Sequence, residues 1–284
     1  MTKILLTGAT GFIGSNFLKH SKFQKIDILV RQEVFVRPKQ KCIVGDMFDN
    51  MVLDQILDEE YDFIVHSAWS GLPARSSELN EKNLTLYSEA IKIFKANSNT
   101  MHIFLGTCLE YGTLNGRVTE DDQGVNLGSF ALTKLKILNE VIKGGLNFSW
   151  LRLFYVYGGN QHNNSLLAHI MNCIKNGEEV NLREPSQLND FIYIEDVIQA
   201  IDELIVKGTN NQIMNIGSGV SESNANIANL VLEQFGMQKK YETLVNRSDG
   251  LCANVDRARN YLNWEPKYSI LEGVRRTINV GVND

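Results

Sequence analysis

The chain has 284 residues, of which 43% are hydrophobic and 21% are charged, so it can bury a sizeable core as one large or two closely joined domains. Its net charge of −5 and isoelectric point of about 5.6 provide no basic field for nucleic acid or an anionic membrane, and neither is expected as a partner. No apolar run reaches the length of a membrane span and no signal pattern precedes the first strand, so a cytoplasmic location is expected. The four cysteines are scattered without a C-x-x-C pair, which predicts neither a disulfide framework nor a zinc site, and no metal is expected.

The first predicted elements are a buried strand and a helix joined by a glycine-rich turn. Apolar residues 4–6 predict the strand, and helical spacing runs over residues 12–19. Gly8 would permit a tight bend, Gly11 would let the backbone approach a pyrophosphate, and Gly14 would let the helix pack closely on the strand. The helix amino terminus offers free N–H groups to phosphates, although such a turn also occurs without a ligand. The expected cofactor contacts in this segment are Gly8, Thr10, Gly11, Phe12, Ile13 and Gly14.

Residues 7–14 read TGATGFIG and resemble the opening of extended short-chain dehydrogenases/reductases, the family of nucleotide-sugar epimerases, dehydratases and ketoreductases. Later motifs match this family in chain order, including N-I-G-S-G at residues 215–219 and a closing L-x-W-x-P at residues 262–266. The resemblance therefore extends over nearly the whole chain. It implies an α/β fold, with a parallel doubly wound (Rossmann) sheet for the cofactor and a smaller carboxyl-terminal lobe for the substrate.

The next predicted strands carry residues for the adenosine half of a dinucleotide. Residues 26–30 predict a second strand, and Arg31 follows it. An acidic residue at this point suits the ribose of NAD, whereas arginine suits the 2′-phosphate of NADP, so NADP is preferred and NAD is the alternative. The alternative interpretation is that Arg31 is only a solvated loop cation with no contact to the cofactor. The third predicted strand ends at Asp46, which resembles the family's adenine-contacting aspartate, with Met47 beside it; Asp46 is equally suited to cap a helix predicted over residues 50–58.

Residues 63–69 predict a central strand that ends in small side chains, which leave room for a ligand. Residues 66–69 read HSAW and resemble the family's H-x-A-A segment, in which backbone groups line the cofactor. The resemblance therefore places Ala68 and Trp69 beside the nicotinamide. His66 is expected to be a hydrogen-bonded core residue, with a catalytic or metal-binding role as the alternative.

A strongly helical stretch over residues 81–95 precedes a fifth predicted strand at 101–106. By resemblance, Asn83 steadies the backbone of the active site and contacts the cofactor region. Thr107, directly after the strand, matches the family's serine or threonine that hydrogen-bonds the reacting hydroxyl or carbonyl. We expect Thr107 to be both a catalytic and a substrate contact.

The two residues after Thr107 argue against one class of reaction. Family 4,6-dehydratases commonly carry an Asp-Glu pair here, whereas this chain has Cys108 and Leu109, so a dehydratase is disfavoured and Cys108 is expected to line the substrate. Glu110 follows, and a strand-like backbone would turn it away from the face that presents Leu109. A structural role is expected for Glu110, with a catalytic role as the alternative.

The largest departure from the family lies at the start of the next predicted helix. The family signature is Y-x-x-x-K, in which tyrosine is the general acid or base and lysine lowers its pKa and binds the nicotinamide ribose. This chain has Phe130 and Lys134 at those positions. A phenyl ring cannot exchange a proton, and a positioned acid or base contributes roughly 10²- to 10⁴-fold in rate.

Three explanations fit Phe130. It is a deliberate tyrosine replacement that traps a substrate, or a natural residue in an enzyme whose proton is relayed by Thr107, Cys108, a substrate hydroxyl or water. The third explanation is an inactive homologue that binds a nucleotide sugar without converting it. The sequence leaves the three open.

Motifs for the substrate lie in the second half of the chain. Residues 152–158 resemble the family's R-x-x-N-x-Y-G strand, with Tyr155 in place of the asparagine. Residues 190–197 closely match the family's D-F-x-Y-V-x-D-V, with Asn189 in place of the arginine that usually assists the nucleotide phosphates. Arg247 stands where the family has a second diphosphate-binding arginine, and an exposed loop cation is its alternative role. Tyr155, Asn189 and Arg247 are the expected substrate contacts here.

These resemblances imply a dinucleotide-binding domain over residues 1–155 with a returning segment near 190–213, and a substrate lobe over 156–189 and 214–284. The expected function is NADPH-dependent reduction of a 4-keto-6-deoxy sugar nucleotide by hydride transfer. A nucleotide-sugar epimerase is one alternative, and a non-catalytic protein that binds the cofactor and nucleotide sugar is another. A homodimer through the helices near 83–95 and 130–143 is expected from the family alone.

Overall fold

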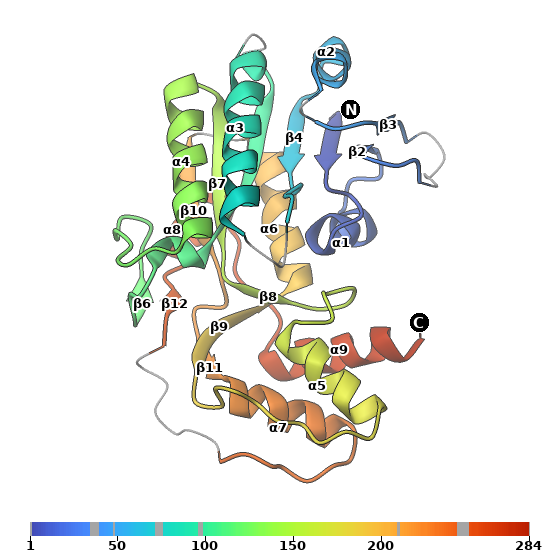
Figure 1. The fold of residues 1–284 in the computed structure, drawn as a ribbon, viewed down its shortest axis with the longest axis vertical. Coiled ribbons are helices and arrows are strands. Elements are labelled where there is room, and N and C mark those ends of the chain that lie inside the picture. The colour runs from blue at the N-terminus through green and yellow to red at the C-terminus, as the bar shows by residue number, and fades with distance from the viewer. Residues whose placement is uncertain are drawn as a thin grey trace. The chain divides into compact units, whose positions relative to one another are not determined.

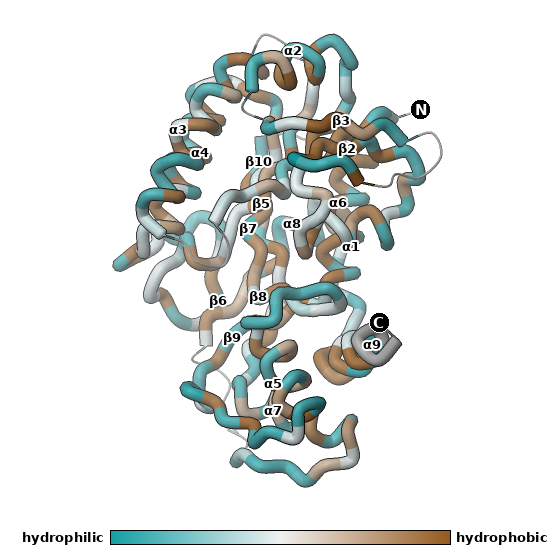
Figure 2. Tube along the Cα trace, turned by 45° about the vertical axis from the view of Figure 1, so that its right-hand side comes forward, coloured by the Kyte–Doolittle hydropathy of each residue, from teal (hydrophilic) through white to brown (hydrophobic). Residues whose placement is uncertain are grey.

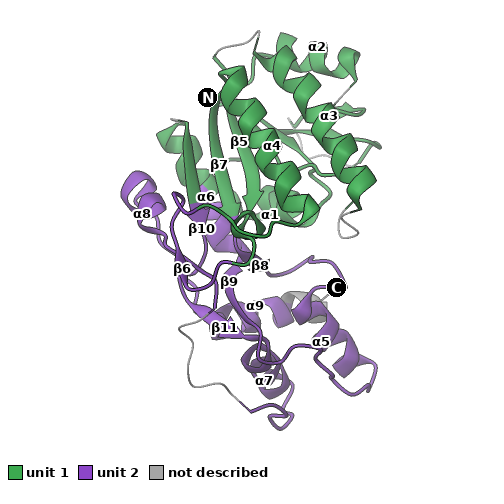
Figure 3. Cartoon of the chain, turned by 60° about the vertical axis from the view of Figure 1, so that its left-hand side comes forward, with its two compact units in different colours: residues 1–113, 123–152, 201–214 green, residues 114–122, 153–200, 215–284 purple. Residues whose placement is uncertain are grey.

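The computed structural model describes residues 2–34, 40–47, 49–71, 76–95, 99–208, 211–242 and 250–283. The chain divides into two compact units, each assembled from separate segments (Figure 3). Unit 1 consists of residues 1–113, 123–152 and 201–214, and unit 2 of residues 114–122, 153–200 and 215–284. Unit 1 thus ends its main segment at 152 rather than 155, and its returning segment is shorter than the expected 190–213.

The described residues of unit 1 are built around a seven-stranded sheet (Figure 1). In spatial order its strands are β10 (Gln212–Ile216), β7 (Asn147–Leu153), β5 (Met101–Thr107), β4 (Phe63–His66), β1 (Ile4–Thr7), β2 (Ile26–Val30) and β3 (Cys42–Val44). Parallel pairing joins β3, β2, β1, β4 and β5. After β1 the chain adds β2 and β3 on one side and then β4, β5, β7 and β10 on the other, so the strand order reverses between β1 and β4. Ligands of such sheets bind at this reversal, beyond the carboxyl ends of the strands.

Helices cover the sheet with their apolar faces. The helices α3 (Ser77–Phe94) and α4 (Ser129–Gly144) lie side by side on one face (Figure 1). Hydrophobic and hydrophilic residues alternate along both, as in helices with one buried side (Figure 2). The buried side chains of Trp150, Phe104 and Ile64 lie in the core that these helices cover. Among the described residues, no helix combines the length and the apolar character that crossing a membrane requires.

Two acidic side chains fix other helices of unit 1. The carboxylate of Asp202, on α6 (Ile194–Lys207), accepts the hydroxyl of Ser21 at 2.6 Å and the backbone N–H of Lys22 at 2.8 Å, which holds the end of α1 (Phe12–His20). Asp49 caps α2 (Asn50–Asp58) by accepting the N–H of Met51 at 2.8 Å. The alternative role of Asp46 as the cap of this helix is therefore wrong, because the residue directly before the helix supplies the cap.

Unit 2 contains a three-stranded sheet in its described residues, with the order β11 (Ser221–Ser223), β9 (Leu188–Tyr193) and β8 (Tyr155–Tyr157). A two-stranded sheet pairs β6 (Arg117–Val118) with β12 (Cys252–Ala253). Buried Asp190 on β9 joins these parts, because its carboxylate accepts the N–H groups of Ser218, Gly219 and Ala253 at 2.6 to 2.9 Å. The helices in the described part of this unit are the first turns of α6 together with α5 (Leu166–Lys175), α7 (Asn224–Gln234), α8 (Asp256–Leu262) and α9 (Ile270–Asn283).

The structure differs from the sequence predictions at the ends of two central strands. β4 ends at His66, three residues before the predicted end, because the N–H of Ala68 turns to the hydroxyl of Thr7 at 3.2 Å. The predicted strand-like backbone around Glu110 is wrong, since residues Cys108–Tyr111 form the 3-10 helix η1. Thr107 and Glu110 cap this turn reciprocally: the Thr107 hydroxyl accepts the N–H of Leu109, and the Glu110 carboxylate accepts the N–H of Thr107.

Candidate active site

The glycine turn between β1 and α1 has no room for a side chain at Gly8 or at Gly14. Gly8 has a φ of +70°, and a β-carbon there would lie 2.6 Å from the backbone nitrogen of Ala68. A β-carbon on Gly14 would lie 2.2 Å from the carbonyl oxygen of Gly8. α1 begins at Phe12, and its N-cap Gly11 provides no side-chain cap, so the N–H groups of the first turn remain for a ligand. This cradle fits the pyrophosphate of a dinucleotide.

The backbone after β4 is held beside this turn by hydrogen bonds from α3. Asn83 on α3 donates its side-chain N–H to the carbonyl of Ser70 at 2.9 Å, and its side-chain oxygen accepts the Ser70 N–H at 3.2 Å. The hydroxyl of Tyr87 donates to the carbonyl of Ala68 at 2.8 Å. Both donors lie on the buried face of α3. The segment with Ala68 and Trp69 therefore has a fixed position at the carboxyl end of β4.

Trp69, Phe130 and Lys134 form a cluster at the carboxyl ends of β4 and β5. The Trp69 ring meets the Phe130 ring edge-on, with centroids 5.3 Å apart and an angle of 82°. The ammonium nitrogen of Lys134 lies 3.9 Å from the centroid of the Trp69 ring and donates to the carbonyl of Leu105 at 2.8 Å. The indole N–H of Trp69 is buried and meets no acceptor among the described residues, so it is available to an acceptor on a ligand.

The electrostatics of this cluster centre on Lys134. Burial lowers the pKa of Lys134 from its ordinary value to about 7, and the nearby Glu110 carboxylate opposes the shift. No ion pair holds the ammonium within the described parts of the chain. Near neutral pH the side chain can therefore either keep or release its proton, a property suited to acid and base chemistry.

Glu110 belongs to a buried network rather than to the surface of the site. It is 1% exposed and accepts Nε of Arg152 at 2.8 Å and the indole N–H of Trp150 at 3.1 Å. Arg152 also donates to the hydroxyl of Tyr111 at 3.0 Å. Burial raises the pKa of the Glu110 carboxyl, an effect that the Arg152 guanidinium opposes. These contacts hold the backbone of Thr107, and they account for the structural role expected of Glu110.

His66 is a hydrogen-bonded core residue, as the sequence predicts. It is 3% exposed, and its Nε2 is 3.0 Å from Nδ1 of His102 on the neighbouring strand. Its ring also stacks on Phe104 with centroids 4.2 Å apart. Burial lowers the pKa of His66 well below its ordinary value, so both imidazoles are neutral at pH 7. Among the described residues, no group of three or more His, Cys, Asp or Glu side chains is arranged to hold a metal ion.

The residues expected to contact the adenosine follow β2 and β3, at the edge of the sheet opposite β10. Arg31 is exposed directly after β2, and no ion pair to it occurs among the described residues. Asp46 is exposed after β3, whereas Met47 is buried in the core. Asp27 is occupied in the core, because its carboxylate accepts the Tyr61 hydroxyl at 3.1 Å. Arg31 is thus an exposed cation at the end of β2.

The other expected substrate residues lie in unit 2, at the start of η1 in unit 1, or outside the described residues. Tyr155 on β8 is 37% exposed. Asn189 on β9 is 6% exposed and donates to the side-chain oxygen of Asn224 at 3.3 Å, which leaves it little contact with solvent. Cys108, in unit 1, is buried at the start of η1. Arg247 lies outside the described residues.

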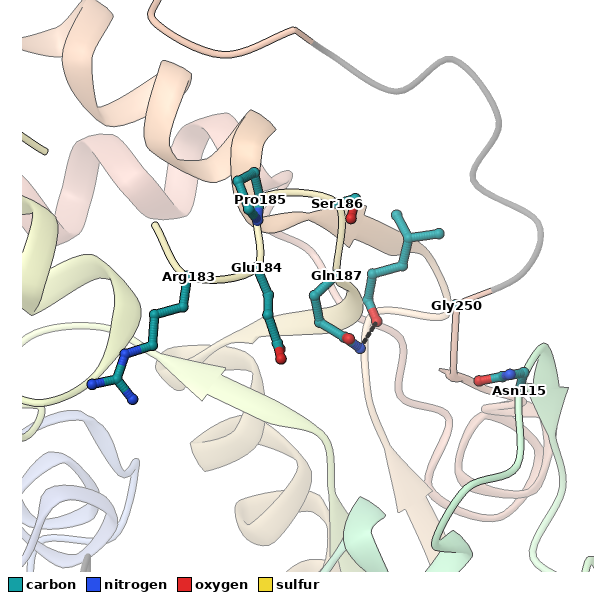
Figure 4. Close-up of a pocket in the computed structure, with 8 residues that line it drawn as sticks. Asn115, Arg183, Glu184, Pro185, Ser186, Gln187 and Gly250 are labelled. Carbon is teal, nitrogen blue, oxygen red and sulfur yellow. Dashed lines mark hydrogen bonds between the residues drawn. The ribbon is translucent and has the colours of Figure 1, made fainter. Parts of the chain in front are cut away.

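Unit 2 also contains a polar pocket of about 390 Å³ that the sequence motifs did not indicate (Figure 4). Its main wall is the loop before β9, where Gln187 donates its side-chain N–H to the Leu188 carbonyl at 3.3 Å (Figure 4). Hydrogen bonds from the start of α7 hold this loop, including Ala225 N–H to the Pro185 carbonyl at 2.8 Å. The lining residues are Asn115, Arg183, Glu184, Pro185, Ser186, Gln187, Leu188 and Gly250.

Sequence reasoning missed the partners that set the properties of the site. The contacts of Trp69 with Lys134 and of Glu110 with Arg152 join residues far apart in the chain, so no local sequence pattern predicts them. The pocket wall likewise depends on how the loop before β9 meets α7. The one available signal was the bulky Trp69 at a position where the related segment has a small residue.

Comparisons with known proteins agree with this geometry. The model of the NAD dependent epimerase/dehydratase family matches residues 4–217. The UDP-glucose 4-epimerase of Lactobacillus helveticus is 24% identical, over 97% of this chain and 95% of that protein. The dTDP-6-deoxy-L-talose 4-dehydrogenase (NAD(P)(+)) of Kitasatospora kifunensis is 24% identical, over 96% of this chain and 93% of that protein.

The fold is shared with a crystal structure of dTDP-glucose 4,6-dehydratase from Bacillus anthracis in complex with NAD. The TM-score is 0.86 and the identity 22%, with 100% of this chain and 97% of that chain covered. The parallel sheet, the glycine cradle and the matching family model lead to one conclusion: this chain belongs to the NAD dependent epimerase/dehydratase family, whose members are enzymes that modify nucleotide sugars.

Proposed function

We propose that this chain uses NADPH to reduce the ketone of a 4-keto-6-deoxy sugar nucleotide. The observation that carries the proposal is the composition of the strand ends around Thr107. A hydroxyl and a part-buried ammonium lie there, while the two positions after Thr107, which are acidic in related dehydratases, are Cys108 and Leu109. Such a site can polarise a carbonyl and supply a proton, but it lacks the carboxylates for eliminating water.

Each residue then has a defined task. The N–H groups of Phe12, Ile13 and Gly14 bind the pyrophosphate, and Arg31 binds the 2′-phosphate that distinguishes NADPH from NADH. Bound cofactor would supply hydride at the nicotinamide C4. The Thr107 hydroxyl donates a hydrogen bond to the ketone oxygen, and Lys134 adds positive potential where negative charge develops. In unit 2, Tyr155, Asn189 and Arg247 are proposed to contact the sugar nucleotide.

The similarity to a 4-dehydrogenase named for NAD(P)(+) supports the reductase, because reduction of the 4-ketone is the reverse of that oxidation. Epimerisation is the second candidate, and it is supported by the similarity to UDP-glucose 4-epimerase. An epimerase keeps its cofactor and shows no net consumption of NADPH. We also propose a cytoplasmic homodimer through α3 and α4, on the family resemblance alone.

The proposal is tested by following NADPH and NADH oxidation with a panel of 4-keto-6-deoxy nucleotide sugars. Oxidation is expected with at least one sugar nucleotide and is faster with NADPH than with NADH. Thr107→Val removes the hydrogen bond to the ketone and is expected to lower kcat by about 10²-fold. Thr107→Ser is the matched control, since it keeps both the hydroxyl and its cap on η1 and retains most of the activity.

Binding measurements with the same panel identify the outcome that contradicts the proposal. If cofactor and sugar nucleotide both bind to the wild-type chain, and neither that chain nor Phe130→Tyr oxidises NADPH, the reductase assignment is wrong. Interconversion of two sugar epimers without NADPH consumption would then favour the second candidate.

A further inference from the structure

The Lys134 ammonium contacts one backbone carbonyl and two aromatic rings. One of its three N–H groups donates to the Leu105 carbonyl at 2.8 Å, the one acceptor that it meets among the described residues. The faces of Trp69 and Phe130 shield it, at 3.9 and 5.9 Å from the ring centroids. Two N–H groups therefore remain for a ligand in an environment with little water.

The Lys134 ammonium is bound to the same strand, β5, that carries Thr107, the proposed contact of the substrate ketone. Leu105 and Thr107 lie on the same strand, two residues or about 7 Å apart at the usual strand rise. A ketone oxygen that accepts the Thr107 hydroxyl would therefore lie on the order of 7 Å from an ammonium anchored at Leu105. Lysine side chains rotate freely enough to cover such a gap.

The other ionisable groups around Lys134 are engaged elsewhere or have a pKa far from neutrality, so they are poorly suited to donate a proton at neutral pH. On β4 and β5, His66 and His102 are buried and neutral, and they point into the core. On η1, the Glu110 carboxylate is enclosed by donors, among them Arg152 on β7. On α3, burial raises the pKa of the Tyr87 phenol far above neutrality.

Phe130, at the family's tyrosine position, has no exchangeable proton, and Cys108 is a buried thiol. We propose that Lys134 itself is the proton donor of the reaction in this chain, in place of the tyrosine that Phe130 replaces. The inference rests on the proposed ketone reduction and extends it.

The step balances without a further reactant. The ketone carbon accepts a hydride from the reduced nicotinamide, and the π pair of the C=O bond moves onto the oxygen. That oxygen forms an O–H bond as the N–H bond of Lys134 breaks, which leaves a neutral amine and an alcohol. Solvent returns the proton to the amine before the next turnover. The ordinary pKa of lysine is too high for efficient donation near pH 7, and burial lowers it to about 7, where donation is most efficient.

The first test uses the protein without substrate. Trace acetylation at a series of pH values, read by mass spectrometry, reports the free-amine fraction of each lysine. The Lys134 peptide is expected to reach half of its maximal reactivity near pH 7, at least two pH units below Nα-acetyllysine amide. A reactivity of Lys134 that rises over the same pH range as that of the reference compound would overturn the proposal.

The second test follows kcat against pH at saturating cofactor and sugar nucleotide. Because the donor must be protonated, kcat is expected to fall about tenfold for each pH unit above 7. Lys134→Ala removes the donor, and kcat falls by at least 10²-fold. Added methylamine restores it at least tenfold, with a pH dependence that follows the added amine. Lys136→Met, an exposed lysine of the same helix, is the control and keeps the wild-type profile.

Phe130→Tyr separates a failure of this inference from a failure of the proposed function. If only Phe130→Tyr oxidises NADPH, the reductase is confirmed and Lys134 is not a sufficient donor, which overturns the inference. A wild-type kcat that stays constant from pH 6 to 9, or Lys134→Ala that no amine rescues, also overturns it. If neither the wild-type chain nor Phe130→Tyr oxidises NADPH, the proposed function itself fails.

Discussion

Replacement of Gly14 by alanine is expected to remove dinucleotide binding. The added β-carbon would lie 2.2 Å from the carbonyl oxygen of Gly8 and 2.9 Å from the α-carbon of Ala9, distances that only a backbone shift can relieve. That carbonyl accepts the N–H of Gly11 at 3.0 Å, so the shift disrupts the whole turn. We expect the affinity for NADPH, measured by titration calorimetry, to fall at least 100-fold.

Gly128→Ala provides the matched control. A β-carbon on Gly128 meets no atom within 4 Å, and its φ of −72° is ordinary for alanine. We expect this variant to bind NADPH as the wild-type chain does. A folded Gly14→Ala protein with unchanged NADPH affinity would show that the glycine turn is not the cofactor cradle.

Replacement of Glu110 by alanine is expected to produce the largest loss of stability. The change removes the carboxylate that pairs with the guanidinium of Arg152, a residue 6% exposed, and also removes the acceptor of the Trp150 and Thr107 N–H groups. Breaking a buried ion pair by removing one partner costs about 3–5 kcal/mol. The free energy of unfolding, measured in urea, should fall by that amount.

The double variant Glu110→Ala/Arg152→Met tests the cause of this loss. Without the guanidinium, no uncompensated charge remains, so the double variant should be more stable than Glu110→Ala alone. Losses that simply add, or a loss below about 1 kcal/mol for Glu110→Ala, would contradict the role of this network.

Much of the fold could be predicted because the signals are local. The strand at residues 26–30 and the helix at residues 50–58 have the bounds that the sequence indicates, since apolar periodicity and flanking polar residues mark both. α3 begins four residues before its predicted start, because the hydroxyl of Ser76 accepts the N–H of Leu79 and caps the helix there. The turn at η1 was missed because its cap depends on how Glu110 folds back onto Thr107.

The candidate site, like the fold, has one part that the sequence predicts and another that depends on contacts between distant residues. The glycine cradle is a contiguous motif, and its steric demands follow from residue type and spacing. The environment of Lys134 depends on Trp69, which is brought to it by the pairing of β4 with β5 and by the packing of α4. Spacing along the chain shows which residues are present, but the pKa of Lys134 is set by the neighbours that folding brings to it.

The most direct test of the central claim is transfer of label from cofactor to sugar. The chain is incubated with NADPH that carries deuterium at the nicotinamide C4 and with a 4-keto-6-deoxy sugar nucleotide, and the sugar product is examined by mass spectrometry and NMR. The account predicts an alcohol with one deuterium on the sugar carbon 4, formed in equal amount to the NADP⁺ released. Sugar products that carry no deuterium, while the labelled NADPH remains unoxidised, would contradict it.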